Sequence, residues 1–127
     1  DDQIIIYGES LGTAISIEVA QNREFAGIIL ESPFTSMVEA GKFYYPYLPV
    51  SLLLKDRYET IKKLENINSP ILVMHGKKDK IVPFHMGKKV FEKASEPKFS
   101  YFPDNDDHMM DYNNILLKTL ERFFKSI

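Results

Sequence analysis

The stretch that decides the fold is Gln3-Ile-Ile-Ile-Tyr7 followed by Gly8-Glu9-Ser10-Leu11-Gly12. Its first five residues are mostly β-branched or aromatic, which predicts a strand buried on both faces. A helical stretch, Thr13 to Gln21, follows without a linker, so the chain must turn from strand to helix within about two residues. We expect Gly8 and Gly12 to make room for this corner, because a side chain at either position would meet nearby backbone.

The corner has the pattern G-x-S-x-G, with Ser10 at its tip. Between a strand and a helix this pattern is a nucleophile elbow, which exposes the serine hydroxyl above the positive end of the new helix. The alternative is a tight turn in which Ser10 only caps the helix. The apolar strand before the motif and the helix after it favour the catalytic interpretation.

The composition is that of an ordinary globular protein and excludes several functions. A length of 127 residues suffices for one domain with a core. A net charge of −2 without a basic stripe argues against a nucleic-acid partner. Without cysteine there is no disulfide framework, thiol nucleophile or thiolate metal site, and we expect neither a metal nor a cofactor. The sequence shows no signal peptide and no long apolar run, so we expect a cytoplasmic protein without membrane contact.

The rest of the chain alternates between strands and helices. Further strands are expected at 25–30, 71–75 and 98–102, and helices at 37–43, 56–66, 84–94 and 111–125. This alternation predicts an α/β fold in one domain, 1–127, with a parallel sheet of about four strands and helices on both faces. Residues 43–54 hold two prolines and aromatic residues that do not alternate, which indicates an irregular segment. We interpret it as a cap folded over the site, and the alternative is a segment that docks on a membrane.

Three chemically useful groups follow predicted strands: Ser10, Asp79 and His108. The carboxyl ends of parallel strands meet at one edge of a sheet, where ligand chemistry belongs. A serine hydroxyl needs a base to take its proton, and an imidazole base needs a buried carboxylate to hold its tautomer. The order Ser…Asp…His is that of the α/β-hydrolase arrangement.

Other residues compete for two of these roles. Glu31, at the end of the second strand, is the rival acid, and Asp79 has the alternative of being only a turn residue. His75 and His85 are interpreted as core or surface histidines, although His75 lies at a strand end and could line the site.

Three stretches of the chain resemble the α/β-hydrolase superfamily: IIIYGESLGTA, ILESPFTS and DRYETIKKLENINSPILVMHGKKDKIVPFHMGKKVFE. The nearest branch is that of the small serine hydrolases labelled abhydrolase-domain, lysophospholipase-like or serine-aminopeptidase-like. The resemblance implies that Ser10 is the nucleophile, Asp79 the acid and His108 the base. It also implies that the backbone N–H of Leu11 is one oxyanion donor.

The resemblance covers only the carboxyl-terminal half of a typical member. Together with a first residue that is not Met, it leads us to expect a chain cut from a longer one. The first strands and the loop that carries the second oxyanion donor would then be missing. Members usually carry a glycine just before the final histidine, and we expect Asn105 to supply that left-handed turn here. The elbow strand would form an exposed edge, so we expect a homodimer or association with a missing amino-terminal half.

The sequence therefore predicts a serine hydrolase that cleaves an ester, thioester or amide of a small-molecule acyl substrate through an acyl-enzyme intermediate. The alternative is a non-catalytic half-domain that pairs with another chain, or with itself, through the elbow strand.

Overall fold

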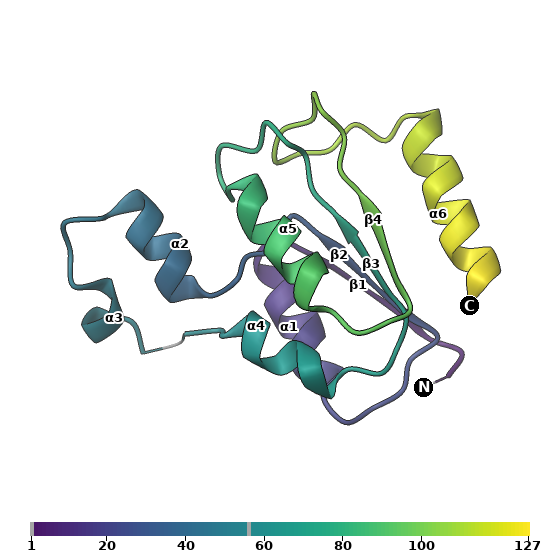
Figure 1. Cartoon of the computed structure of the whole chain (residues 1–127), viewed down its shortest axis with the longest axis horizontal. Helices are drawn as coiled ribbons and strands as arrows, with labels where there is room; N and C mark the ends of the chain where they lie inside the picture. The colour runs from purple at the N-terminus through teal and green to yellow at the C-terminus, as the bar shows by residue number, and fades with distance from the viewer. Residues whose placement is uncertain (1, 56) are drawn as a thin grey trace.

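The computed structural model describes residues 2–55 and 57–127. Four strands form one parallel sheet in the order β1-β2-β3-β4 (Figure 1). The strands are β1 Ile5–Glu9, β2 Gly27–Glu31, β3 Ile71–Met74 and β4 Lys98–Tyr101. The helices are α1 Leu11–Val19, α2 Met37–Tyr44, α3 Val50–Leu53, α4 Thr60–Lys63, α5 Phe84–Lys93 and α6 Asn114–Ser126, with a 3₁₀ turn at Leu64–Asn66. The predicted α/β fold with a parallel sheet is confirmed.

Helices cover both faces of the sheet because the central strands carry apolar side chains on both sides. All residues of β2 and β3 are buried, and alternate positions point to opposite faces. One face packs against α1 and α5, which contribute Ile17 and Val90 to its core. The other packs against α6 through Leu116 and Phe123. Figure 1 shows α6 on one side of the sheet and α1, α4 and α5 on the other.

Strand β1 departs from the prediction of a strand buried on both faces. It lies at the edge of the sheet, where its one partner among the described strands is β2. It begins and ends two residues later in the chain than expected. Ile4, Ile5 and Tyr7 are 52%, 38% and 44% exposed, and only Ile6 packs against the core. The apolar run was read correctly as a strand, but no element of the described chain covers its outer side.

The segment between β2 and β3 follows the prediction in part. Ser36 caps α2 by accepting the Glu39 N–H at 3.0 Å. Of residues 43–54, which were expected to be irregular, the first two belong to α2, residues 45–49 are irregular, and the short helix α3 follows. Figure 1 shows α2 and α3 beside the sheet, on its left. The helix expected from 56 begins only at Thr60, because Tyr58 has a left-handed backbone with φ 41°. Asp56 lies outside the described residues. Within 2–55 and 57–127, no helix is both long and apolar enough to cross a bilayer.

Candidate functional site

The carboxyl ends of the four strands lie side by side in the sheet. The loops that carry the candidate residues therefore leave the sheet at the same edge. Glu9, Glu31, Met74 and Tyr101 are neighbours along the ladders. The residues that follow the first three are Ser10, Ser32 and His75. These three therefore begin at one rim of the sheet, as the sequence predicted for a parallel arrangement.

Ser10 occupies a strained corner between β1 and α1. Its backbone has φ 51° and ψ −116°, a region that residues with a side chain rarely adopt. Its N–H donates to the Glu31 carbonyl at 2.8 Å, and its own carbonyl accepts the N–H of Thr13 at 3.0 Å. Its side chain makes no capping hydrogen bond to α1. The corner has the strand-to-helix context of a nucleophile elbow, and the capping alternative does not apply.

Only one of the two elbow glycines is required by close packing. A Cβ built on Gly8 would lie 2.5 Å from the Gly12 carbonyl oxygen and 2.3 Å from Ser16 Oγ. A Cβ on Gly12 would meet nothing within 4 Å. The prediction of a clash at Gly12 was therefore wrong, because the first turn of α1 stands at the open edge of the sheet.

Asp79 lies in the loop between β3 and α5 and is held by four donors. Its Oδ1 accepts the N–H groups of Ile81 and Val82, each at 2.8 Å. Its Oδ2 lies 2.8 Å from His108 Nδ1 and 3.1 Å from His75 Nε2. Burial raises the pKa of Asp79, but these hydrogen bonds outweigh it and lower the pKa to about 2. The carboxylate is thus charged at neutral pH, although its side chain is fully buried.

His108 reaches Asp79 because the loops after β3 and β4 touch along their backbones. The Lys78 N–H donates to the Asp106 carbonyl at 2.9 Å. A Cβ on Gly76 would lie 2.3 Å from that same carbonyl oxygen, so only glycine allows this approach. The His108 side chain remains 12% exposed. Asn105 does not adopt the left-handed backbone expected of it. The loops after β3 and β4 come close to each other at Gly76 instead.

The structure also places the competing residues. Glu31 is buried and accepts hydrogen bonds from the hydroxyls of Tyr7 and of Tyr112, the latter at 2.7 Å, and the described structure gives it no histidine partner. Burial and the hydrogen bond to Glu31 raise the pKa of Tyr7 above its ordinary value. His85 is exposed on α5, with its ring 6.5 Å from that of Phe43.

His75 is the site residue that sequence reasoning undervalued. It is completely buried and contacts the Asp79 carboxylate. The available signal was its position four residues before Asp79, directly after a buried strand.

Strand β2 lies between β1, which Ser10 follows, and β3, which leads to Asp79. Ser32, at the next strand end, donates through Oγ to the His108 carbonyl at 3.4 Å. No hydrogen bond within the described residues joins the Ser10 hydroxyl to His108. Leu11 is the first residue of α1, so its N–H belongs to the helix end that has no internal acceptor.

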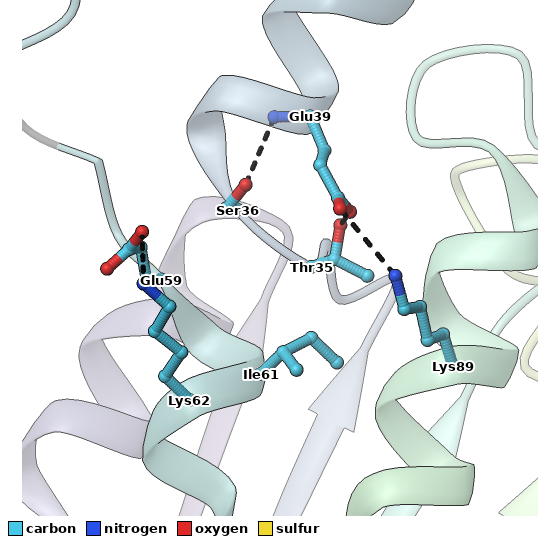
Figure 2. Close-up of a pocket in the computed structure, with 7 residues that line it drawn as sticks. All are labelled: Thr35, Ser36, Glu39, Glu59, Ile61, Lys62 and Lys89. Atoms are coloured by element: carbon cyan, nitrogen blue, oxygen red, sulfur yellow. Dashed lines mark hydrogen bonds and ion pairs between the residues drawn. The ribbon is translucent and has the colours of Figure 1, made fainter. Parts of the chain in front are cut away.

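Two cavities lie near these elements. An open cavity of about 370 Å³ beside His108 is lined by Lys78, Lys80, Ile81, Asn105, Asp107, His108 and Met109. Figure 2 shows a second cavity of about 150 Å³ between α2, α4 and α5. There Lys89 pairs with Glu39 at 3.6 Å and Lys62 pairs with Glu59 at 3.0 Å. Because these charges neutralise one another, the cavity beside His108 is the better candidate for substrate.

Within residues 2–55 and 57–127, no group of three or more histidine, aspartate or glutamate side chains is placed to hold a metal ion.

Comparisons with known proteins identify relatives of this chain. An uncharacterized protein of Mycobacterium tuberculosis is 37% identical over 125 residues, which cover 95% of this chain and 44% of that protein. Human alpha/beta hydrolase domain-containing protein 17B is 34% identical over 96 residues, covering 76% of this chain and 32% of that protein. The chain thus spans less than half the length of the curated relatives that it matches.

Solved structures share the fold at low sequence identity. The monoacylglycerol lipase of Paleococcus ferrophilus superposes with a TM-score of 0.70 at 17% identity, covering 98% of this chain and 69% of that one. A family model described as the prolyl oligopeptidase family matches residues 1–126. The chain therefore belongs to the prolyl oligopeptidase family and, with it, to the α/β-hydrolase superfamily.

Proposed function

We propose that this chain carries the catalytic residues of a serine hydrolase that cleaves an ester, thioester or amide through an acyl-enzyme intermediate. Ser10 is the nucleophile, His108 the general base and Asp79 the acid that holds His108. The observation that carries the proposal is the contact of 2.8 Å between His108 Nδ1 and Asp79 Oδ2 at the rim where Ser10 forms a strained corner.

In the first step, His108 Nε2 takes the proton of Ser10 while Oγ attacks the carbonyl carbon of the substrate. The Oγ–C bond forms and the carbonyl oxygen becomes an oxyanion, which the Leu11 N–H stabilises. His108 then gives its proton to the leaving group, whose bond to the carbon breaks. Water then attacks the carbonyl carbon of the acyl-serine while His108 takes one of its protons. The bond between that carbon and Ser10 Oγ breaks, His108 returns the proton to Oγ, and the acid product leaves.

Asp79 makes His108 suitable for this task. With its charge fixed by four donors, it accepts the Nδ1–H and leaves Nε2 with its lone pair toward the substrate side. It also stabilises the imidazolium that forms during each step. The names of the relatives support the reaction class, because one is called a hydrolase and a structural neighbour a lipase.

The hydrolysis of a small activated ester, p-nitrophenyl acetate, tests the proposal. Ser10→Ala should reduce the rate to that of the uncatalysed reaction. Ser32→Ala is the matched control, because Ser32 also follows a strand with φ 51° but is fully buried. Ester hydrolysis that survives in Ser10→Ala and disappears in Ser32→Ala would refute the assignment.

A second candidate function is favoured by the open edge of β1. Beside the exposed strand, α1 presents an outward apolar stripe of Leu11, Ile15 and Val19, which are 48%, 52% and 43% exposed. Such a surface suits a non-catalytic half-domain that pairs with another chain or with itself. A folded chain that self-associates but reacts with no serine-directed probe would favour this candidate over the hydrolase.

A further inference from the structure

His75 is an unusual buried histidine that the reaction above does not use. It follows β3, its side chain has no exposed surface, and its ring packs edge-on against Phe84 with centroids 5.9 Å apart. Helix α5 leaves room for the ring at Gly87, where a Cβ would lie 2.1 Å from His75 Nδ1. Two elements thus enclose a single imidazole in one orientation.

The contacts of this ring assign its tautomer. Nε2 lies 2.8 Å from the Val82 carbonyl and 3.1 Å from Asp79 Oδ2. Both partners are acceptors, so Nε2 must carry the hydrogen. Nδ1 is buried and finds no hydrogen-bond partner among the described residues. A proton there would be a buried donor without an acceptor, which is costly, so the ring is neutral with its hydrogen on Nε2.

We propose that His75 is a positioning residue, whose neutral ring shares its Nε2 hydrogen between the Val82 carbonyl and Asp79 Oδ2 and so holds that carboxylate in place against His108. Its effect on catalysis rests on the proposed function, in which Asp79 and His108 are partners. Without His75, Oδ2 keeps His108 as its one imidazole donor, and of the contacts that join Asp79 to Val82 only the direct bond from the Val82 N–H to Oδ1 remains among the described residues.

The sharing of Oδ2 has a consequence for His108. The imidazoles of His75 and His108 both contact Oδ2 of Asp79. The negative charge of this oxygen therefore stabilises each ring less than it would stabilise a single ring. Removing the His75 donor leaves more of that charge to stabilise the protonated form of His108. The titration midpoint of His108 should then move to higher pH. The charged groups that line the cavity beside His108 are Lys78, Lys80 and Asp107, and they are the same in every variant.

Enzyme kinetics on His75→Leu and His75→Gln test the proposal. The leucine removes the donor, whereas the glutamine amide reaches about as far as Nε2 and restores it. In His75→Leu we expect kcat to fall about 10–100-fold with KM unchanged, because His75 does not line the cavity. The acid limb of the pH profile should move up by roughly 0.5–1 unit, and His75→Gln should return it toward the wild-type position.

A merely structural role would lower the amount of folded protein without moving the pH profile. An unmoved midpoint in His75→Leu, or the same shift in His75→Gln, would therefore overturn the proposal. If His75→Leu does not fold, the tautomer of His75 in the wild-type chain decides in its place.

Proton–nitrogen correlation spectra of the histidine rings give a readout that does not depend on activity. In the wild-type chain at neutral pH, His75 should show the pattern of a neutral ring with its hydrogen on Nε2, because Nε2 faces two acceptors and Nδ1 faces none among the described residues. A His75 ring that carries its hydrogen on Nδ1, or on both nitrogens, contradicts the proposal even if the chain hydrolyses esters. If the wild type hydrolyses nothing, the proposed function fails, and the His108 midpoint in the spectra of the variants still tests the role of His75.

Discussion

Replacing Asp79 by asparagine should both destabilise the chain and remove part of its pH dependence. The neighbours of Asp79 lower its pKa from 3.8 to about 2. A difference of nearly two pKa units corresponds to about 2 kcal/mol of folding stability. Because the pKa is lower in the folded chain, this stability is fully present above about pH 4 and is lost as the pH falls from about 4 toward 2.

Asparagine imitates the protonated acid, because it is neutral. Its amide oxygen can still accept from Ile81 and Val82, which leaves its amide nitrogen facing the imidazole donors of His75 and His108. Asp79→Asn should therefore lower the free energy of unfolding by about 2 kcal/mol at pH 6. The gap to the wild type should shrink to about 1 kcal/mol at pH 3, since Asp79 in the unfolded wild-type chain, with its pKa of 3.8, is then largely protonated and must release that proton on folding.

Urea unfolding followed by circular dichroism at pH 6, 4 and 3 measures these gaps. Asp107→Asn is the matched control, because Asp107 is exposed, lines the same cavity and accepts only the Met109 N–H. It should change the stability by less than about 0.5 kcal/mol. A gap for Asp79→Asn that is absent at pH 6, or equally large at pH 3, would refute the reasoning.

The same substitution should lower ester turnover by about 10⁴-fold, because His108 then takes the wrong tautomer. Glu31→Gln should have a mild effect on turnover, since Glu31 bonds to two tyrosines and not to a histidine. If Glu31→Gln is the crippling change and Asp79→Asn is mild, Glu31 is the acid.

Three further predictions concern the base, the elbow and the edge. The rate of ester hydrolysis should rise with pH through a midpoint of ~6–7.5. This rise should vanish in His108→Ala but persist in His85→Ala. An unchanged pH profile in His108→Ala would mean that His108 is not the base of the triad. Gly8→Ala should cost about 1–3 kcal/mol in urea unfolding, whereas Gly12→Ala should be tolerated, and equal losses would contradict the contacts of the corner. Light scattering at micromolar concentration should show a dimer or larger species, because β1 is an open apolar edge; a monodisperse monomer would contradict this.

Much of the fold could be predicted because its signals are local. The apolar runs at β2 and β3 and the alternation of strands and helices suffice for a parallel sheet. The edge position of β1 could be predicted only from the resemblance, which covers just the carboxyl-terminal half of a typical member. The apolar run from Ile4 to Tyr7 by itself predicts burial on both faces, because it does not indicate which element covers the strand.

The site could be predicted as far as chain order allows. The order of Ser10, Asp79 and His108 along the sequence places them after the first, third and fourth strands, and the structure brings Asp79 and His108 into contact. The role of His75 could not be predicted, because it depends on the gap at Gly87 and on the shared oxygen of Asp79. Both are contacts between residues that only the folded chain brings together.

Labelling with a fluorophosphonate probe, followed by peptide mapping, tests the central claim most directly. The probe forms a covalent bond only with a serine oxygen that a base has activated. The account predicts one adduct, on Ser10, that is lost in Ser10→Ala and strongly reduced in His108→Ala. A folded chain that forms no adduct, or forms it on the buried Ser32, would contradict the assignment of Ser10 as the nucleophile.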